Sequence, residues 1–91
     1  MKVLVVRPME LPAVQEIDHT LSAMQKLVGG TIQAVYPFDD PVALVCNDEG
    51  KLLGLPWNRA LTDDHGVPYD IVCGTFFVAG LKEDDFASLT E

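Results

Sequence analysis

The feature that most constrains the fold is a long apolar run, Ile71–Leu81, which follows Tyr69 and is rich in β-branched and aromatic residues. Such a run, bounded by polar turn residues, is typical of a strand that is buried on both faces. We expect Tyr69–Leu81 to form one buried strand. Gly74 within it predicts a bulge or a close approach of another backbone.

Five other segments predict strands. Val42–Cys46 and Lys51–Leu55 flank the turn residues 47–50, which predicts a hairpin. Thr31–Tyr36 alternates with a period of two until Pro37, so we expect a strand there. The first two predicted strands, joined by a proline-marked loop, are Lys2–Arg7 and Ala13–Asp18.

Helical spacing is clear in one place. Leu21, Met24, Leu27 and Val28 share a helical face, Asp18 or Thr20 can cap its start, and residues 29–30, both glycine, can end it. The C-terminal segment Glu83–Leu89 also predicts one or two helical turns, with its acidic residues at the dipole-favourable end.

The predicted element order is therefore ββαββββα. Strands and helices do not alternate, so we expect an α+β fold with a curved, mostly antiparallel sheet of five or six strands, one face of which is covered by the helix at 20–28. Whether the sheet stays open or closes toward a barrel is left open. A chain of 91 residues has enough surface to bury for one core only, so we expect a single domain, 1–91.

Charge limits the kinds of partner. Six basic and fourteen acidic residues give a net charge of −8, which argues against direct nucleic-acid binding and favours a basic partner or none. The chain has no apolar run of about 18 residues, and its start lacks the features of a signal peptide, so we expect no membrane span and a cytoplasmic location.

The two cysteines, Cys46 and Cys73, lie within apolar runs, where we expect buried free thiols rather than a disulfide. His19 and His65 do not complete a zinc-ligand spacing, and neither a metal nor a cofactor is predicted. No nucleophile and base occur at motif spacing, and the acidic pairs are typical of solvated turns. We therefore expect a protein that is not an enzyme.

Two clusters are candidate ligand-binding sites. The first is a loop bounded by prolines that carries Tyr36, Phe38, Asp39 and Asp40, where rigid backbone displays aromatic surface. The alternative is that its aromatic side chains turn into the core.

The second cluster is Trp57, Asn58 and Arg59, which together suit a nucleotide-like ligand: an aromatic ring for stacking, an amide that donates and accepts, and a planar cation for phosphate. The alternative is structural, with Asn58 in a turn and Arg59 paired with an aspartate.

The stretches Val35–Asn47, Glu49–Leu52, Asn58–Leu61 and Gly74–Val78, with their order and spacing, resemble a family of small bacterial proteins classed as a domain of unknown function. The resemblance extends over nearly the whole chain. It implies a protein carried by phages, plasmids and conjugative elements. It gives no catalytic residue, but Asn58, Arg59 and Thr75 match its motif positions, so Thr75 joins the candidate ligand-binding residues.

These observations lead to three hypotheses. The first is a binder that sequesters a small nucleotide-type immune signal and so counters host defence. The second is an acidic, DNA-mimic-like inhibitor of a host defence or restriction protein. The third is a structural or regulatory module of the mobile element. We also expect a homodimer, because a long apolar strand in so small a chain leaves an edge to be paired.

Overall fold

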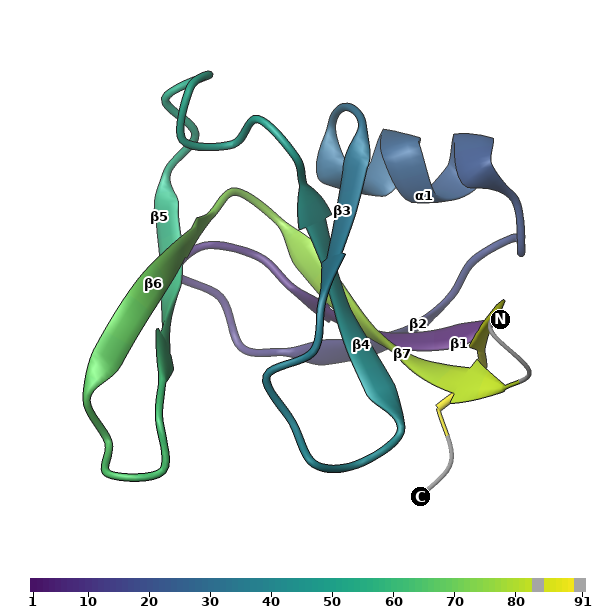
Figure 1. Cartoon of the computed structure of the whole chain (residues 1–91). Coiled ribbons are helices and arrows are strands. Elements are labelled where there is room, and N and C mark those ends of the chain that lie inside the picture. The colour runs from purple at the N-terminus through teal and green to yellow at the C-terminus, as the bar shows by residue number, and fades with distance from the viewer. Residues whose placement is uncertain (83–84, 90–91) are drawn as a thin grey trace.

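The structure is a computed structural model that describes residues 1–82 and 85–89 (Figure 1). These residues form one helix, α1 (Leu21–Val28), and eight strands. The strands are β1 (Lys2–Val6), β2 (Ala13–Glu16), β3 (Ile32–Val35), β4 (Val42–Asn47), β5 (Trp57–Thr62), β6 (Pro68–Cys73), β7 (Phe76–Lys82) and β8 (Asp85–Ala87).

Six of the strands form one sheet in the order β2-β1-β7-β4-β3, with β8 paired to the end of β7. The other two, β5 and β6, form a separate hairpin. All pairings in the described part of the chain are antiparallel. The expected α+β class with a mostly antiparallel sheet is confirmed. The sheet is open, with β2 and β3 at its two edges, so it does not close toward a barrel.

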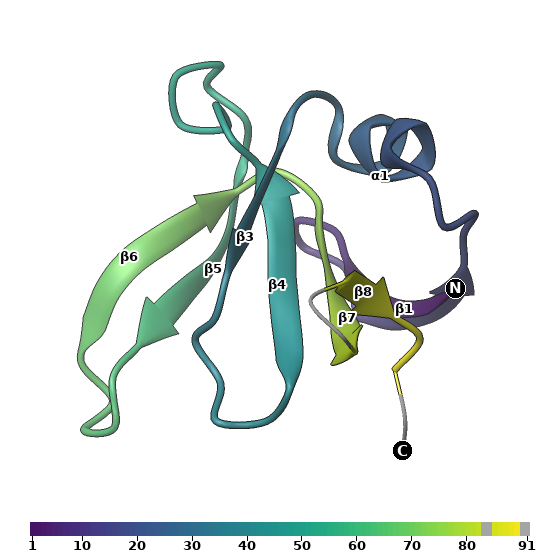
Figure 2. The ribbon, with the colours of Figure 1, turned by 45° about the vertical axis from the view of Figure 1, so that its right-hand side comes forward.

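Helix α1 lies on one face of the six-stranded sheet and the β5–β6 hairpin packs on the other (Figures 1 and 2). Along β4, Ala43 and Val45 pack in the cluster with the helix, while Leu44 and Cys46 pack in the cluster with the hairpin. Burial on both faces explains why the Val42–Cys46 run is apolar without alternation.

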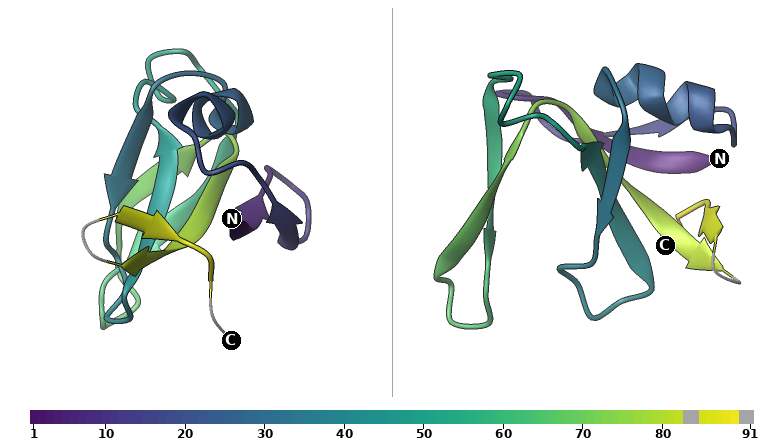
Figure 3. Two further views of the ribbon diagram at one scale, coloured as in Figure 1. Left: turned by 90° about the vertical axis from the view of Figure 1, so that its right-hand side faces the viewer. Right: turned by 45° about the horizontal axis from the view of Figure 1, so that its top comes forward.

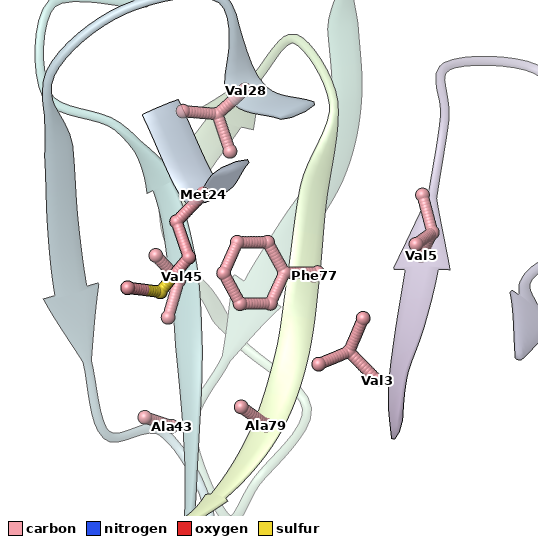
Figure 4. Packing of buried hydrophobic residues seen from close by; sticks show 8 residues of the cluster. All are labelled: Val3, Val5, Met24, Val28, Ala43, Val45, Phe77 and Ala79. Carbon is pink, nitrogen blue, oxygen red and sulfur yellow. The ribbon is translucent and has the colours of Figure 1, made fainter. Parts of the chain in front are cut away.

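Helix α1 begins and ends where its cap residues predict. The Thr20 hydroxyl accepts a hydrogen bond from the Ala23 amide at 3.1 Å, and Gly29 adopts a left-handed conformation with φ of 82°. Met24 and Val28 extend from the helix into the same cluster as Phe77, which is fully buried, and the end of the Met24 side chain lies beside Val45 (Figure 4). The predicted helix is confirmed, with Thr20 rather than Asp18 as its cap.

The predicted hairpin between Val42–Cys46 and Lys51–Leu55 is wrong. β4 pairs with β3 on one side and with β7 on the other, so both of its edges are taken. Residues 48–54 form consecutive turns, in which the Leu53 amide donates to the Glu49 carbonyl at 2.9 Å. The strand that follows is β5, and its partner is β6.

The prediction of one strand from Tyr69 to Leu81 is also wrong. The chain leaves β6 at Cys73, turns at Gly74, and enters the other sheet as β7. Gly74 has φ of 85°, and its amide donates to the Pro56 carbonyl at 2.7 Å. A Cβ at this position would lie 2.7 Å from Leu55 Cδ1, so the close neighbour that a Cβ would meet at Gly74 is a side chain and not the expected backbone.

The predicted C-terminal helix is wrong in the described residues, because Asp85–Ala87 forms β8; Glu83 and Asp84 lie outside them. Hydrogen bonds tie the next residues to β1: the Lys2 amide donates to Ser88 Oγ, and the Leu89 amide donates to the Lys2 carbonyl, both at 2.9 Å. Pairing with β7 and β1 therefore outweighs the local helical preference of this segment.

The expected dimer stays a prediction. It assumed that the strand Tyr69–Leu81 has an open edge: β7 pairs with β1 and β8 on one side and with β4 on the other, whereas β6 pairs with β5 alone. The described residues contain no helix with the length and apolar character needed to cross a membrane.

Candidate functional site

The side chain of Asn58 holds three parts of the backbone together. It lies at an irregularity in the β5–β6 register, and its Nδ2 donates to the Val6 and Gly74 carbonyls, both at 2.8 Å. These two bonds use both amide hydrogens. Asn58 therefore joins the end of β1, the start of β5 and the β6–β7 junction, which favours a structural role for this residue, although in a strand and not in the expected turn.

Arg59 is exposed and its guanidinium contacts backbone. Nη1 donates to the Asn58 carbonyl and to Asn58 Oδ1, both at 3.0 Å, and Nη2 donates to the Glu10 carbonyl at 3.3 Å. Within residues 1–82 and 85–89 no carboxylate lies within ion-pair distance of it. Arg59 thus ties the β1–β2 loop, residues 7–12, to the start of β5 rather than pairing with an aspartate.

Apolar side chains are displayed on both sides of this contact. Trp57 is 74% exposed, and in the β1–β2 loop Met9 and Leu11 are 98% and 90% exposed. Met9 has φ of 61°, a left-handed conformation that is uncommon for a residue other than glycine. The loop therefore presents apolar surface to solvent.

The first predicted cluster lies elsewhere. Tyr36, Phe38, Asp39 and Asp40 are exposed in the loop from β3 to β4, so the aromatic side chains do not turn into the core. This loop enters β4 at its first residue, whereas the segment that leads to Trp57 leaves β4 at its last (Figures 1 and 2). The two predicted clusters therefore lie at opposite ends of β4. Thr75 is half-buried between β6 and β7.

A cleft of about 390 Å³ lies between the hairpin face of the sheet and the β5–β6 hairpin. The splayed arrangement of these elements is visible in Figure 3 (right). We call it the cysteine cleft, because Cys46 of β4 and Cys73 of β6 both line it. Its apolar wall residues are Val35, Leu61, Ile71 and Val72, and its polar ones include Gln33, Asp48, Glu49, Lys51 and Asp70. None of the eight predicted site residues lines it.

Lys51 and Asp70 form an ion pair at this cleft, from the turns after β4 to strand β6. The hydrogen bond from Lys51 lowers the pKa of Asp70, and the same bond raises the pKa of Lys51. With Asp48 and Glu49 also lining the cleft, its charged side chains are three carboxylates and one ammonium. The cysteine cleft therefore carries a net negative charge.

Burial raises the pKa of the Cys46 thiol, and the carboxylates of Asp48 and Asp70 raise it further. The thiol is therefore protonated at neutral pH and is a poor nucleophile. Both cysteines are free and buried, as expected. No group of three or more His, Cys, Asp or Glu side chains in the described residues is arranged to hold a metal ion.

No local pattern in the sequence predicts this cleft. Cys46 and Cys73 were recognised as buried, but only the packing of β6 over β4 brings them to one site. The assignment of Lys51 to a strand also hid its ion pair with Asp70, which depends on the turn that the chain forms there.

The fold defines a small α+β domain: an open antiparallel sheet between one helix and one hairpin, with a cleft beneath the hairpin. Neither a curated protein nor a solved structure matches the chain. Residues 1–91 match the family described as Domain of unknown function (DUF3846), and the chain belongs to that family.

Proposed function

We propose that this protein is a non-catalytic binding protein that engages a basic protein partner, with the cysteine cleft receiving a lysine or arginine side chain of that partner. The observation that carries the proposal is the make-up of the cleft. Apolar walls from Leu61 and Val72 suit the aliphatic stem of such a side chain, and the carboxylates of Asp48 and Glu49 suit its charged end.

The charge of the whole chain supports the same partner. A net charge of −8 attracts a basic surface over a distance of about 10 Å at moderate salt and speeds the encounter. The same charge repels phosphate groups from a cleft that is itself net negative. An anionic nucleotide is therefore a poor fit to the cysteine cleft.

In this proposal the protein acts in the cytoplasm of a bacterium that carries a phage or other mobile element. There it would occupy the nucleic-acid-binding surface of a host defence or restriction protein, because such surfaces are rich in lysine and arginine. This role accounts for a small acidic chain that binds without catalysis.

A second candidate is the sequestration of a nucleotide-type signal at Trp57 and Arg59. It is supported by the exposure of both side chains at the start of β5, where an aromatic ring and a guanidinium are two residues apart in sequence. Against it, the guanidinium already donates to the Asn58 and Glu10 carbonyls. A ligand phosphate must compete with these bonds.

One NMR titration separates the two candidates. The ¹⁵N-labelled protein is titrated with n-butylguanidinium, as the mimic of an arginine side chain, and separately with a cyclic dinucleotide. The proposal predicts saturable shifts of the amides of Cys46, Cys73 and Asp70 with n-butylguanidinium alone. Shifts that cluster at Trp57 and Arg59 with the cyclic dinucleotide would instead support the second candidate.

The matched control neutralises the cleft without changing its shape. Asp48→Asn combined with Glu49→Gln should weaken n-butylguanidinium binding about tenfold, whereas Asp39→Asn combined with Asp40→Asn, in the loop at the other end of β4, should leave it unchanged. Equal weakening by both double variants would show a general charge effect and count against the cleft.

A further inference from the structure

Strand β2 is an edge of the six-stranded sheet with part of its backbone unpaired. The Ile17 amide donates to the Met1 carbonyl at 2.9 Å, while the amide and carbonyl of Lys2 bond to residues 88 and 89 on the other side of β1. Because inward and outward groups alternate along an antiparallel pair, Ala13 and Gln15 bond to β1. The backbone groups of Val14 and Glu16 therefore point away from the sheet.

Exposed apolar side chains lie at this edge, and two of them, Met9 and Leu11, are more exposed than any other large apolar side chain in residues 1–82 and 85–89. Met9 and Leu11 lie in the loop that leads into β2, and Val14, within the strand, is 64% exposed. Val14 is also the last member of an apolar row across the hairpin face, in register with Leu4 of β1 and, through it, with Val78 of β7. The row ends at the sheet edge with Val14, whose apolar side chain is exposed to solvent.

Charge is low at this edge although the whole chain carries −8. The stretch 8–15 contains a single charged residue, Glu10. The two arginines of the chain also lie here: Arg59 donates to the Glu10 carbonyl, and Arg7 donates to the Gln15 side chain at 3.4 Å. The remaining carboxylate of the strand, Glu16, is ion-paired with the terminal amine at 3.4 Å. Within β2 itself, the one carboxylate is therefore already ion-paired when two copies meet at this edge.

We propose that β2 pairs with β2 of a second copy, antiparallel about a two-fold axis, with Val14 opposite Val14 of the partner. This register forms two hydrogen bonds between the Val14 residues. It adds two more hydrogen bonds, one from the Glu16 amide of each copy to the Pro12 carbonyl of the other. The apolar row then runs from one sheet into the other, and Leu11 of each copy is brought to the joint surface.

Proline near an edge strand commonly blocks such pairing, because proline lacks an amide hydrogen. In this register Pro12 contributes only its carbonyl, as an acceptor, so the proline does not prevent the two β2 strands from pairing. The other edge, β3, has no exposed large apolar side chain within the strand. The combination of an outward backbone and an exposed apolar row therefore favours β2.

The test is sedimentation equilibrium of the whole chain. A pair of four-residue edges is small, so we expect a dissociation constant of about 10–100 µM. The mass should rise from 9.9 kDa toward twice that value as concentration increases through this range. Raising the NaCl concentration from 0.1 to about 0.5 M should tighten the dimer severalfold, because salt screens the repulsion between two chains of −8.

Val14→Lys should abolish the dimer, because it places the lysine side chains of the two copies opposite each other at the centre of the strand pair, where their charges repel. Val67→Lys is the matched control: Val67 is similarly exposed but lies in the β5–β6 turn, so this variant should dimerise like the unmodified protein. Both variants are checked for folding by their ¹⁵N spectra. A mass of 9.9 kDa at all concentrations, or equal dimerisation of the two variants, would overturn the proposal.

Discussion

The side-chain amide of Asn58 donates to the main-chain carbonyl of Gly74 at 2.8 Å, across 16 residues of sequence. Its second hydrogen bond, to the Val6 carbonyl at 2.8 Å, reaches a third part of the chain. Gly74 is the point at which the chain leaves the hairpin for the large sheet. One amide group therefore fixes the hairpin against the sheet and, with it, the shape of the cysteine cleft.

Asn58→Ala should destabilise the fold strongly, because it leaves the Val6 and Gly74 carbonyls without their partner. Loss of these bonds should cost about 2–3 kcal/mol, which corresponds to a fall in Tm of roughly 10–20 °C. Arg59→Ala is the neighbouring control. Its bonds are exposed and no buried charge is left behind, so we expect a loss below about 1 kcal/mol. Thermal melts of both variants check this, and equal losses would contradict the role assigned to Asn58.

The contrast between these two residues shows how far the sequence could predict the candidate site. Residue types alone favoured Trp57, Asn58 and Arg59 as a ligand-binding group, because an amide and a guanidinium can bind either a ligand or a backbone carbonyl. Which of these they bind depends on residues that are distant in sequence, such as Val6 and Gly74. Local pattern carries no information on those contacts.

The fold was predictable where local and tertiary preferences agree. The α1 helix has its cap at Thr20, its apolar face and its terminal Gly29, so its bounds followed from the sequence. The segment Tyr69–Leu81 predicts one buried strand, and nothing in its apolar character indicates that the parts before and after Gly74 belong to different sheets or that Pro68, Tyr69 and Asp70 of β6 are exposed. Residues 51–55 were predicted as a strand because an apolar run after a turn suits a hairpin, yet β4 has no free edge to offer.

Gly80→Ala tests the C-terminal strand that replaced the expected helix. A Cβ on Gly80 would lie 2.6 Å from the Ser88 carbonyl oxygen and 3.3 Å from that of Ala87, so the backbone after β8 has to move. We expect a loss of about 1–3 kcal/mol in a urea melt, with faster hydrogen exchange in residues 85–89.

Gly66→Ala provides the comparison for Gly80→Ala. Gly66 has φ of 78° in the β5–β6 turn with nothing within 4 Å, so this variant carries backbone strain but no collision. It should cost about 1 kcal/mol and leave exchange at 85–89 unchanged. If faster exchange at 85–89 also occurred in Gly66→Ala, it could not be assigned to the contact between Gly80 and Ser88.

The Lys51–Asp70 ion pair should make stability depend on pH at both extremes. The pKa of Asp70 is lowered by the Lys51 hydrogen bond, so its contribution is present above the ordinary value of 3.8 and is lost as pH falls through the lowered pKa. The pKa of Lys51 is raised, so its contribution is present below the ordinary value of 10.5 and is lost as pH rises through the raised pKa.

Lys51→Met removes one partner of this pair. The carboxyl pKa of Asp70, followed by ¹³C NMR, should rise toward 3.8 in this variant. Lys26→Met, which removes a lysine from α1, should leave that pKa unchanged. The Tm of Lys51→Met should be lower than that of the unmodified protein at pH 7, and the difference should shrink as pH falls through the lowered pKa of Asp70. An unchanged Asp70 pKa in Lys51→Met would show that the two side chains are not paired in solution.

The last prediction concerns the reactivity of Cys46. Its pKa is raised above the ordinary value of 9.0, first by burial and then by the charge of Asp48. In Cys73→Ser, where Cys46 is the remaining thiol, alkylation by iodoacetamide at pH 8 should be at least about tenfold slower in native protein than in urea, because the thiolate is the reacting form. The rate should keep rising above pH 9, as the raised pKa requires.

Asp48→Asn, introduced into Cys73→Ser, tests the cause of this slow reaction. Removing the carboxylate lowers the Cys46 pKa, but burial remains the larger influence, so alkylation should speed up only about twofold. Asp63→Asn, which changes a carboxylate of the β5–β6 turn, is the control for net charge and should leave the rate unchanged. A native rate equal to the rate in urea would mean that Cys46 is accessible to solvent. The cysteine cleft would then lack the buried wall at Cys46, which would count against the binding of a basic side chain there.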